Sequence, residues 1–151
     1  MKKYIYIILV PLILLSCDYT PIYSSKNDYD FSIGKINFNG DSEINNLIKK
    51  KLMKFQNNQN EKKFIITATT SYKKMSQSKD LSGKTTSYLI IVEIIFKIRK
   101  ENEEKTIIDK EEFLIKNFYD KSEESKLEKT KTKSLVNSMV NKFIIQLSQI
   151  K

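Results

Sequence analysis

The sequence of 151 residues contains no histidine and no tryptophan, one cysteine, three glycines and two prolines. Without histidine, the chain lacks the commonest metal ligand and the usual general base, and a Ser–His nucleophilic pair is excluded. Three glycines do not form a glycine-rich phosphate-binding loop. We therefore expect a protein without catalytic residues, metal site or cofactor.

Long hydrophobic runs are also missing, except at the amino terminus. After the basic start Met1–Lys3, residues 4–15 carry no charge, and the small residue Ser16 precedes the single cysteine, Cys17. This run is shorter than the ~20 apolar residues that span a bilayer, and it has the size of a signal-peptide core. We predict that residues 1–16 are a signal peptide.

The residues Leu14-Leu15-Ser16-Cys17 resemble the lipobox of bacterial lipoproteins. This resemblance implies that the Cys17 thiol becomes diacylglyceryl-modified, that the chain is cut before Cys17, and that the new amine is acylated, for example with palmitate. Each buried acyl CH₂ contributes ~0.8 kcal/mol, so two or more chains anchor a protein stably without a membrane-spanning helix. The alternative is an ordinary secretory signal with a chance cysteine, but a lone thiol is unusual in an exported protein.

Cleavage before Cys17 would leave 135 residues, enough for one domain, and would lower the net charge from +9 to +7. A basic surface can bind nucleic acid, anionic lipid or phosphate-bearing glycolipid. An exported lipoprotein meets the last two, so we expect no nucleic-acid partner. Because 26 of the 27 basic residues are lysine and the chain is rich in asparagine and isoleucine, an AT-rich genome is an alternative source of this excess.

The hydrophobic periodicity predicts one α+β domain over residues 31–151, preceded by a lipidated tether at residues 17–30. Alternation indicates strands, and apolar residues at helical spacing indicate helices. The predicted elements are a strand near Ser32–Phe38, a helix at 42–56, strands at 64–72, 85–99 and 106–118, and a helix at 122–149. The order β-α-β-β-β-α is typical of two helices packed on one face of a four-stranded sheet.

Two of these strands break the alternation. Ile33 is out of phase with Ile36 and Phe38, and Asp109 and Glu111 interrupt the apolar positions of the strand at 106–118. For the latter strand we predict a bulge or a start that faces solvent.

The strand at 85–99 predicts a partner-binding surface. If the face that includes Tyr88 and Ile98 packs on the helices, the opposite face presents Leu89, Ile91 and Ile95. Contiguous exposed apolar surface usually marks a binding site, so we expect these three residues to contact a partner. Alternatively, neighbouring strands or residues 18–30 cover them.

The connection at residues 73–84 is rich in lysine and serine. Lysines at a hairpin tip are suited to phosphate groups as point charges. The lysines of this connection are Lys73, Lys74, Lys79 and Lys84. The alternative for this connection is a solvated, mobile loop.

Three stretches resemble the lipopolysaccharide-assembly lipoprotein family, LptE. Residues 17–23 (CDYTPIY) are close to the family's Cys-Gly-Phe-x-Pro-Leu-Tyr opening, and the strand Tyr88–Arg99 and the step at 118–120 into a long terminal helix fit its pattern. The resemblance implies a Gram-negative outer-membrane lipoprotein on the periplasmic face. Such a protein plugs a large β-barrel partner, LptD, assists its assembly, and binds lipopolysaccharide during delivery to the outer leaflet. Basic residues would then contact the lipopolysaccharide phosphates, and the candidates are Lys73, Lys74, Lys79, Lys84 and Arg99.

Asp18 departs from the family's glycine. In enteric bacteria, an aspartate after the lipidated cysteine favours retention in the inner membrane, so that location stays an alternative. A second functional hypothesis is an autonomous lipoprotein that binds anionic lipid or another amphiphile without a barrel. A third, an envelope-anchored hydrolase, is disfavoured by the missing histidine.

Overall fold

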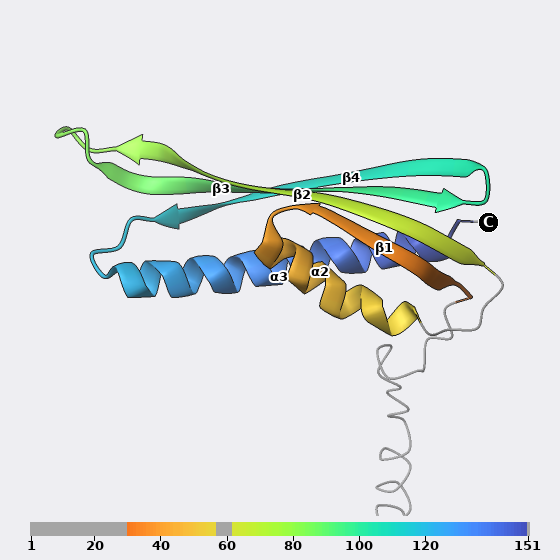
Figure 1. Cartoon of the computed structure of the whole chain (residues 1–151). Coiled ribbons are helices and arrows are strands. Elements are labelled where there is room, and N and C mark those ends of the chain that lie inside the picture. The colour runs from red at the N-terminus through yellow and green to blue at the C-terminus, as the bar shows by residue number, and fades with distance from the viewer. Residues whose placement is uncertain (1–29, 57–61, 151) are drawn as a thin grey trace, which may run out of the picture.

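The computed structural model describes residues 30–56 and 62–150, so the predicted signal peptide, Cys17, Asp18 and the predicted tether up to residue 29 lie outside the described residues. The elements in chain order are β1 (Ser32–Gly40), α2 (Ser42–Leu52), a 3₁₀ turn η1 (Met53–Phe55), β2 (Lys63–Lys79), β3 (Thr85–Lys100), β4 (Glu103–Lys116) and α3 (Lys121–Ser148). This order confirms the predicted α+β class. Figure 1 shows both helices on one face of the four-stranded sheet.

The strands lie in the order β1-β2-β3-β4 across the sheet. β1 and β2 are parallel, so the chain must cross over between them, and α2 lies on this crossover. The Asp41 side chain caps α2 by accepting a hydrogen bond of 2.9 Å from the Ile44 backbone N–H. β2, β3 and β4 follow as antiparallel hairpins, which leaves β1 and β4 at the two edges.

A β-bulge at Gly34 explains the broken alternation of the first strand. Ile33 and Lys35 are opposite consecutive residues of β2, so Gly34 is an extra residue in β1. The extra residue corrects the phase, because Ile33, Ile36 and Phe38 all pair with β2 residues whose side chains face the core. Ile33 is fully buried, and the other two pack against the buried cluster.

Two sequence predictions about strand bounds are wrong. The first half of the predicted connection, Lys73–Lys79, continues β2 and pairs with β3, so only residues 80–84 form the turn. β4 begins at Glu103 rather than 106. It pairs with β3 without a register shift, so of the two predicted alternatives the bulge is absent, and the start of the strand faces solvent at residues 103–106. Asp109 and Glu111 instead lie on the helical face, where Glu111 forms an ion pair with Lys142 of α3.

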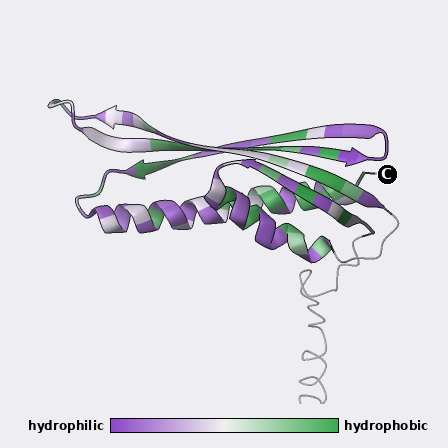
Figure 2. Cartoon of the chain, viewed as in Figure 1, coloured by the Kyte–Doolittle hydropathy of each residue, from purple (hydrophilic) through white to green (hydrophobic). Residues whose placement is uncertain are grey.

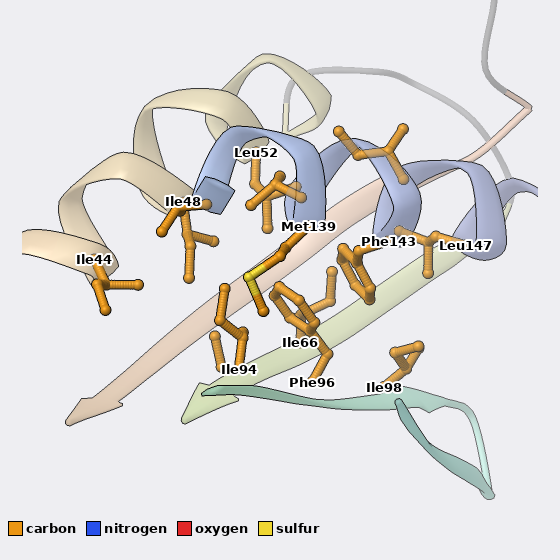
Figure 3. Packing of buried hydrophobic residues seen from close by; sticks show 14 of the residues in the cluster. Ile44, Ile48, Leu52, Ile66, Ile94, Phe96, Ile98, Met139, Phe143 and Leu147 are labelled. Atoms are coloured by element: carbon orange, nitrogen blue, oxygen red, sulfur yellow. The ribbon is translucent and has the colours of Figure 1, made fainter. Parts of the chain in front are cut away.

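The core fills the space between the sheet and the two helices (Figure 3). Burial alternates along the first half of β2 and along β3, because every second side chain faces the helices. Figure 2 shows hydrophobic and hydrophilic stretches along both strands. Phe96 of β3 and Phe143 of α3 stack at the centre with ring centroids 3.8 Å apart. The buried apolar residues of the helices are Ile44, Ile48, Leu52, Val136, Met139, Val140, Phe143, Ile144 and Leu147. The buried apolar residues of α3 therefore all lie in the second half of this helix.

Candidate functional site

The predicted partner-binding residues lie on the sheet face that points away from the helices, which we call the outer face. Leu89, Ile91 and Ile95 all occupy the phase of β3 that alternates with its buried residues. Each is half-buried by side chains of neighbouring strands. Within residues 30–56 and 62–150, no helix or further strand covers this face (Figure 1).

The register of the strands places further apolar side chains on the outer face. Met75, Leu89 and Leu114 form one row across β2, β3 and β4, and Ile95 lies opposite Ile108 in a second row. The exposed fractions are 45% for Met75, 55% for Leu114 and 64% for Ile108. Alternation within one strand does not predict the contribution of these three residues, because it does not reveal which residues of the next strand lie opposite.

Charged residues separate the two apolar rows. Ile91 lies between Lys73 and Glu112, and Glu93 lies opposite Lys110. Opposite charges on adjacent strands attract each other, which favours this register. The outer face therefore presents alternating apolar and charged rows rather than one continuous apolar patch.

The last residue of β4, Lys116, pairs with Ser87 of β3. Past this pair only β2 and β3 continue, and together with their turn at residues 80–84 they form a two-stranded arm. The Asp80 carboxylate builds the turn at its tip, accepting hydrogen bonds of 2.9 Å from the backbone N–H groups of Ser82 and Lys84. The Ser82 hydroxyl and these amides hold the pKa of Asp80 below its usual range. Lys79 and Lys84 flank the turn and are exposed, and Leu81 at the tip is fully exposed.

Lys74 lies on the helical face and not with the other candidate lysines. Its Nζ atom is 2.7 Å from a Glu128 oxygen, 3.1 Å from a Glu124 oxygen and 4.5 Å from the centroid of the Tyr88 ring. The Tyr72 hydroxyl also donates to Glu128, and burial together with this carboxylate raises the pKa of Tyr72. Lys74 therefore connects β2 to the first half of α3.

Glu124 is the centre of this ionic network and is only 5% exposed. Its carboxylate accepts hydrogen bonds from Lys121 at 2.8 Å, from Lys74 at 3.1 Å and from the Phe118 backbone N–H at 3.1 Å. These donors, led by Lys121, lower the pKa of Glu124 to about 2. Since no apolar side chain between Lys121 and Leu135 is buried, this network is the main contact of the first half of α3 with the sheet.

Arg99 lies at the opposite end of β3 from the arm. It is 15 residues from Lys84 along the chain, which corresponds to about 50 Å along an extended strand. There it lines a small hollow of about 270 Å³ together with Lys97 and Glu104. The five candidate phosphate-binding residues therefore do not form one site. Only Lys79 and Lys84 lie at the tip of the arm, and Lys73 lies further along β2, opposite Ile91, where β4 also pairs with β3.

Residues 30–56 and 62–150 contain no cluster of three or more histidine, cysteine, aspartate or glutamate side chains that could hold a metal ion. None of the described helices is long and apolar enough to cross a bilayer.

Two solved structures share this arrangement of helices and strands. The crystal structure of rare lipoprotein B from Shewanella oneidensis matches with a TM-score of 0.54 and 12% sequence identity, over 74% of this chain and 91% of that chain. The chain therefore shares the fold of this protein. The solution structure of an uncharacterized lipoprotein B from Nitrosomonas europaea matches with a TM-score of 0.57 and 12% identity, over 78% and 83% of the two chains. No protein-family model and no curated protein matches the sequence.

Proposed function

We propose that the protein is a non-catalytic outer-membrane lipoprotein of lipopolysaccharide assembly, anchored through Cys17 on the periplasmic face. In this proposal it plugs a β-barrel of the LptD type, helps the barrel to assemble, and contacts lipopolysaccharide during its insertion into the outer leaflet. Two likenesses support the proposal. The opening at residues 17–23 resembles the LptE family, and the fold is shared with a bacterial lipoprotein, rare lipoprotein B.

The outer face is the observation that carries the barrel proposal. A protein that sits in the lumen of a barrel meets a wall that is polar and hydrated, with scattered apolar groups. The rows of the outer face offer both kinds of contact, with Ile108 at 64% exposure beside charged residues such as Lys110 and Glu112. A face of this kind, left bare by the described elements, fits a protein partner better than it fits bulk water.

For the lipopolysaccharide contact we favour the arm over the original set of five residues. Lys79 and Lys84 are exposed at the tip, and Lys73 is exposed on the outer face of the same two strands. Lys74 is held by two carboxylates, and Arg99 is at the other end of the sheet. Lysines that lack such partners can approach phosphate groups without first breaking an ion pair.

The barrel proposal is tested by co-purification of the full-length protein from detergent-solubilised membranes. Ile108→Glu adds a charge to the outer face, and Ile145→Glu is a matched control, because Ile145 is 56% exposed on α3. We expect the first variant to recover at least about tenfold less barrel and the second to recover the normal amount. Equal recovery with both variants, or a wild-type protein that purifies alone as a lipid-carrying monomer, would favour an autonomous amphiphile-binding lipoprotein instead.

The lipopolysaccharide contact is tested by capture of the full-length protein on immobilised lipopolysaccharide. Lys79→Glu/Lys84→Glu reverses two charges at the tip, and Lys97→Glu/Arg99→Glu makes the same change at the other end of β3. We expect the tip variant to lower capture several-fold and the control to change it little. The reverse order of effects would place the contact at the Arg99 end.

A further inference from the structure

A groove between the two helices has the features of a ligand site. It lies between the amino-terminal part of α2 and the first half of α3, and its volume is about 550 Å³. Pockets that hold small ligands have volumes of ~300–1,000 Å³. We propose that this inter-helix groove binds a single-chain amphiphile with an anionic head group. This inference goes beyond the proposed function and concerns the face opposite to the outer face.

The lining of the groove includes a continuous apolar part. Ile44 of α2 is 1% exposed, and Leu47 of α2 and Tyr72 of β2 are half-buried. Past this region the helices are tied together, because Lys51 donates hydrogen bonds to the Asn137 carbonyl and to the Asn141 side chain. An acyl chain placed along the apolar part would remove CH₂ groups from water, which is the main source of its affinity.

Three lysines from the two helices line the same groove. Lys50 comes from α2, and Lys129 and Lys133 come from successive turns of α3. All three are exposed, and in the described part of the chain none of them forms an ion pair. Three unpaired cations around one groove favour an anionic ligand.

The acidic residues that line the groove are already engaged or lie to one side. Asp41 caps α2, and Glu128 is neutralised by Lys74 and hydrogen-bonded by Tyr72. Glu43 lies in the first turn of α2, where a negative charge stabilises the helix dipole. Asp41 and Glu43 keep their charges at the amino-terminal end of α2, whereas the three lysines come from the last turn of α2 and from α3. We therefore expect the anionic head group at the lysines and not at that end of α2.

Thr132 gives an independent indication of a ligand. Thr132 is one of the residues that line the groove. Its hydroxyl oxygen is buried and has no hydrogen-bond partner, the single such side-chain atom within residues 30–56 and 62–150. Buried hydroxyls in folded proteins almost always have a partner. Thr132 lies three residues after Lys129 and directly before Lys133, so it shares their face of α3. A carboxylate or phosphate oxygen held by these lysines would give this hydroxyl an acceptor.

The size of the groove sets the class of amphiphile. A volume near 550 Å³ suits one acyl chain with its head group rather than a lipid with several chains. The proposed ligand is therefore a fatty acid or lysophospholipid, and not the lipopolysaccharide of the proposed function. Failure of one proposal leaves the other standing.

The test uses the full-length protein in neutral phosphatidylcholine vesicles with a diazirine-bearing palmitic acid as the probe. After illumination, mass spectrometry maps the labelled peptides. We expect labelling of residues 41–50 and 125–133 that excess oleate or lysophosphatidic acid removes. A diazirine-bearing alkyl amine of the same chain length should label these peptides at least fivefold less. Labelling spread over other surfaces, or equal labelling by the amine, overturns the proposal.

Variants locate the head group. Lys129→Glu/Lys133→Glu should lower groove labelling at least fivefold, whereas Lys126→Glu, an exposed lysine of α3 outside the groove, should leave it unchanged. Thr132→Val keeps the shape of the side chain and removes the orphan hydroxyl, so it should lower labelling two- to threefold without loss of stability. If circular dichroism shows that the double variant is misfolded, the Thr132→Val result decides, and unchanged labelling in that variant counts against the proposal.

Discussion

The buried carboxylate of Glu124 provides the sharpest test of how α3 is held on the sheet. Glu124→Gln keeps the size of the side chain but removes its charge and replaces one acceptor oxygen with an NH₂ donor, so Lys121 and Lys74 lose their ion pairs with it. A carboxyl whose pKa falls from 4.5 in the unfolded chain to about 2 in the folded protein gains about 3 kcal/mol of stability at neutral pH. Lys121 is 63% exposed, so solvent screens part of its attraction. We expect a loss of about 2 kcal/mol in the variant.

The pH dependence fixes the sign of this effect. Because the folded-state pKa is below the unfolded-state pKa, the contribution of Glu124 is complete above about pH 5. It is lost as the pH falls from 4.5 through about 2, and the carboxyl is protonated in both states only below that pH. The wild-type protein and the glutamine variant should therefore differ at pH 7 and converge near pH 2.

Urea unfolding at several pH values, followed by circular dichroism at 222 nm, measures the difference. Glu123→Gln is the matched control, because Glu123 is an exposed neighbour in the same first turn. Its loss should be about 0.5 kcal/mol, from the helix dipole alone. Equal losses in the two variants, or a Glu124→Gln loss that is as large at pH 2 as at pH 7, would refute the account of this network.

Three further predictions concern stability. Gly40 has a φ of +91°, and a Cβ there would lie 1.9 Å from the Thr70 carbonyl oxygen, so Gly40→Ala should cost about 3 kcal/mol or more. Gly83 has a φ of +82° but open space around it, so Gly83→Ala should cost only about 1 kcal/mol. Similar urea unfolding midpoints for the Gly40→Ala and Gly83→Ala variants would contradict both estimates. Phe143→Ala removes a buried ring stacked on a second phenylalanine and should cost about 3–5 kcal/mol, whereas Tyr119→Ala, at a fully exposed site, should change the unfolding free energy by less than about 0.5 kcal/mol.

The sequence was sufficient for the element order and for the face of β3 that enters the core. Alternation over Tyr88–Ile98 predicts burial of every second residue, and Ile90, Val92 and Ile94 are all fully buried. Burial follows period 2 in a strand because successive side chains point to opposite faces. The bulge at Gly34 could not be predicted from the sequence, because only the pairing with β2 shows which residue of β1 is extra.

The alternation along β2 is sufficient to predict which face of the sheet Lys74 occupies. Lys74 is in phase with Phe64 and Tyr72, so alternation already places it on the helical face. Its partners Glu124 and Glu128 are 50 and 54 residues away, and no local pattern reveals them. The length of β3 likewise separates Arg99 from the arm, a consequence of a rise of about 3.3 Å per residue.

The two halves of α3 are held on the sheet by different forces, and this division links the network to the inter-helix groove. The second half contributes Val136 and five other buried apolar residues, whereas the first half contributes Glu124 and Glu128. The groove is lined by this ionic half, including Lys129 and Lys133. A ligand that binds only when the first half is docked must stabilise that docked state, and the network must in turn raise the affinity of the ligand. Loss of the Glu124 charge should therefore weaken groove labelling by the palmitic acid probe, although Glu124 does not line the groove.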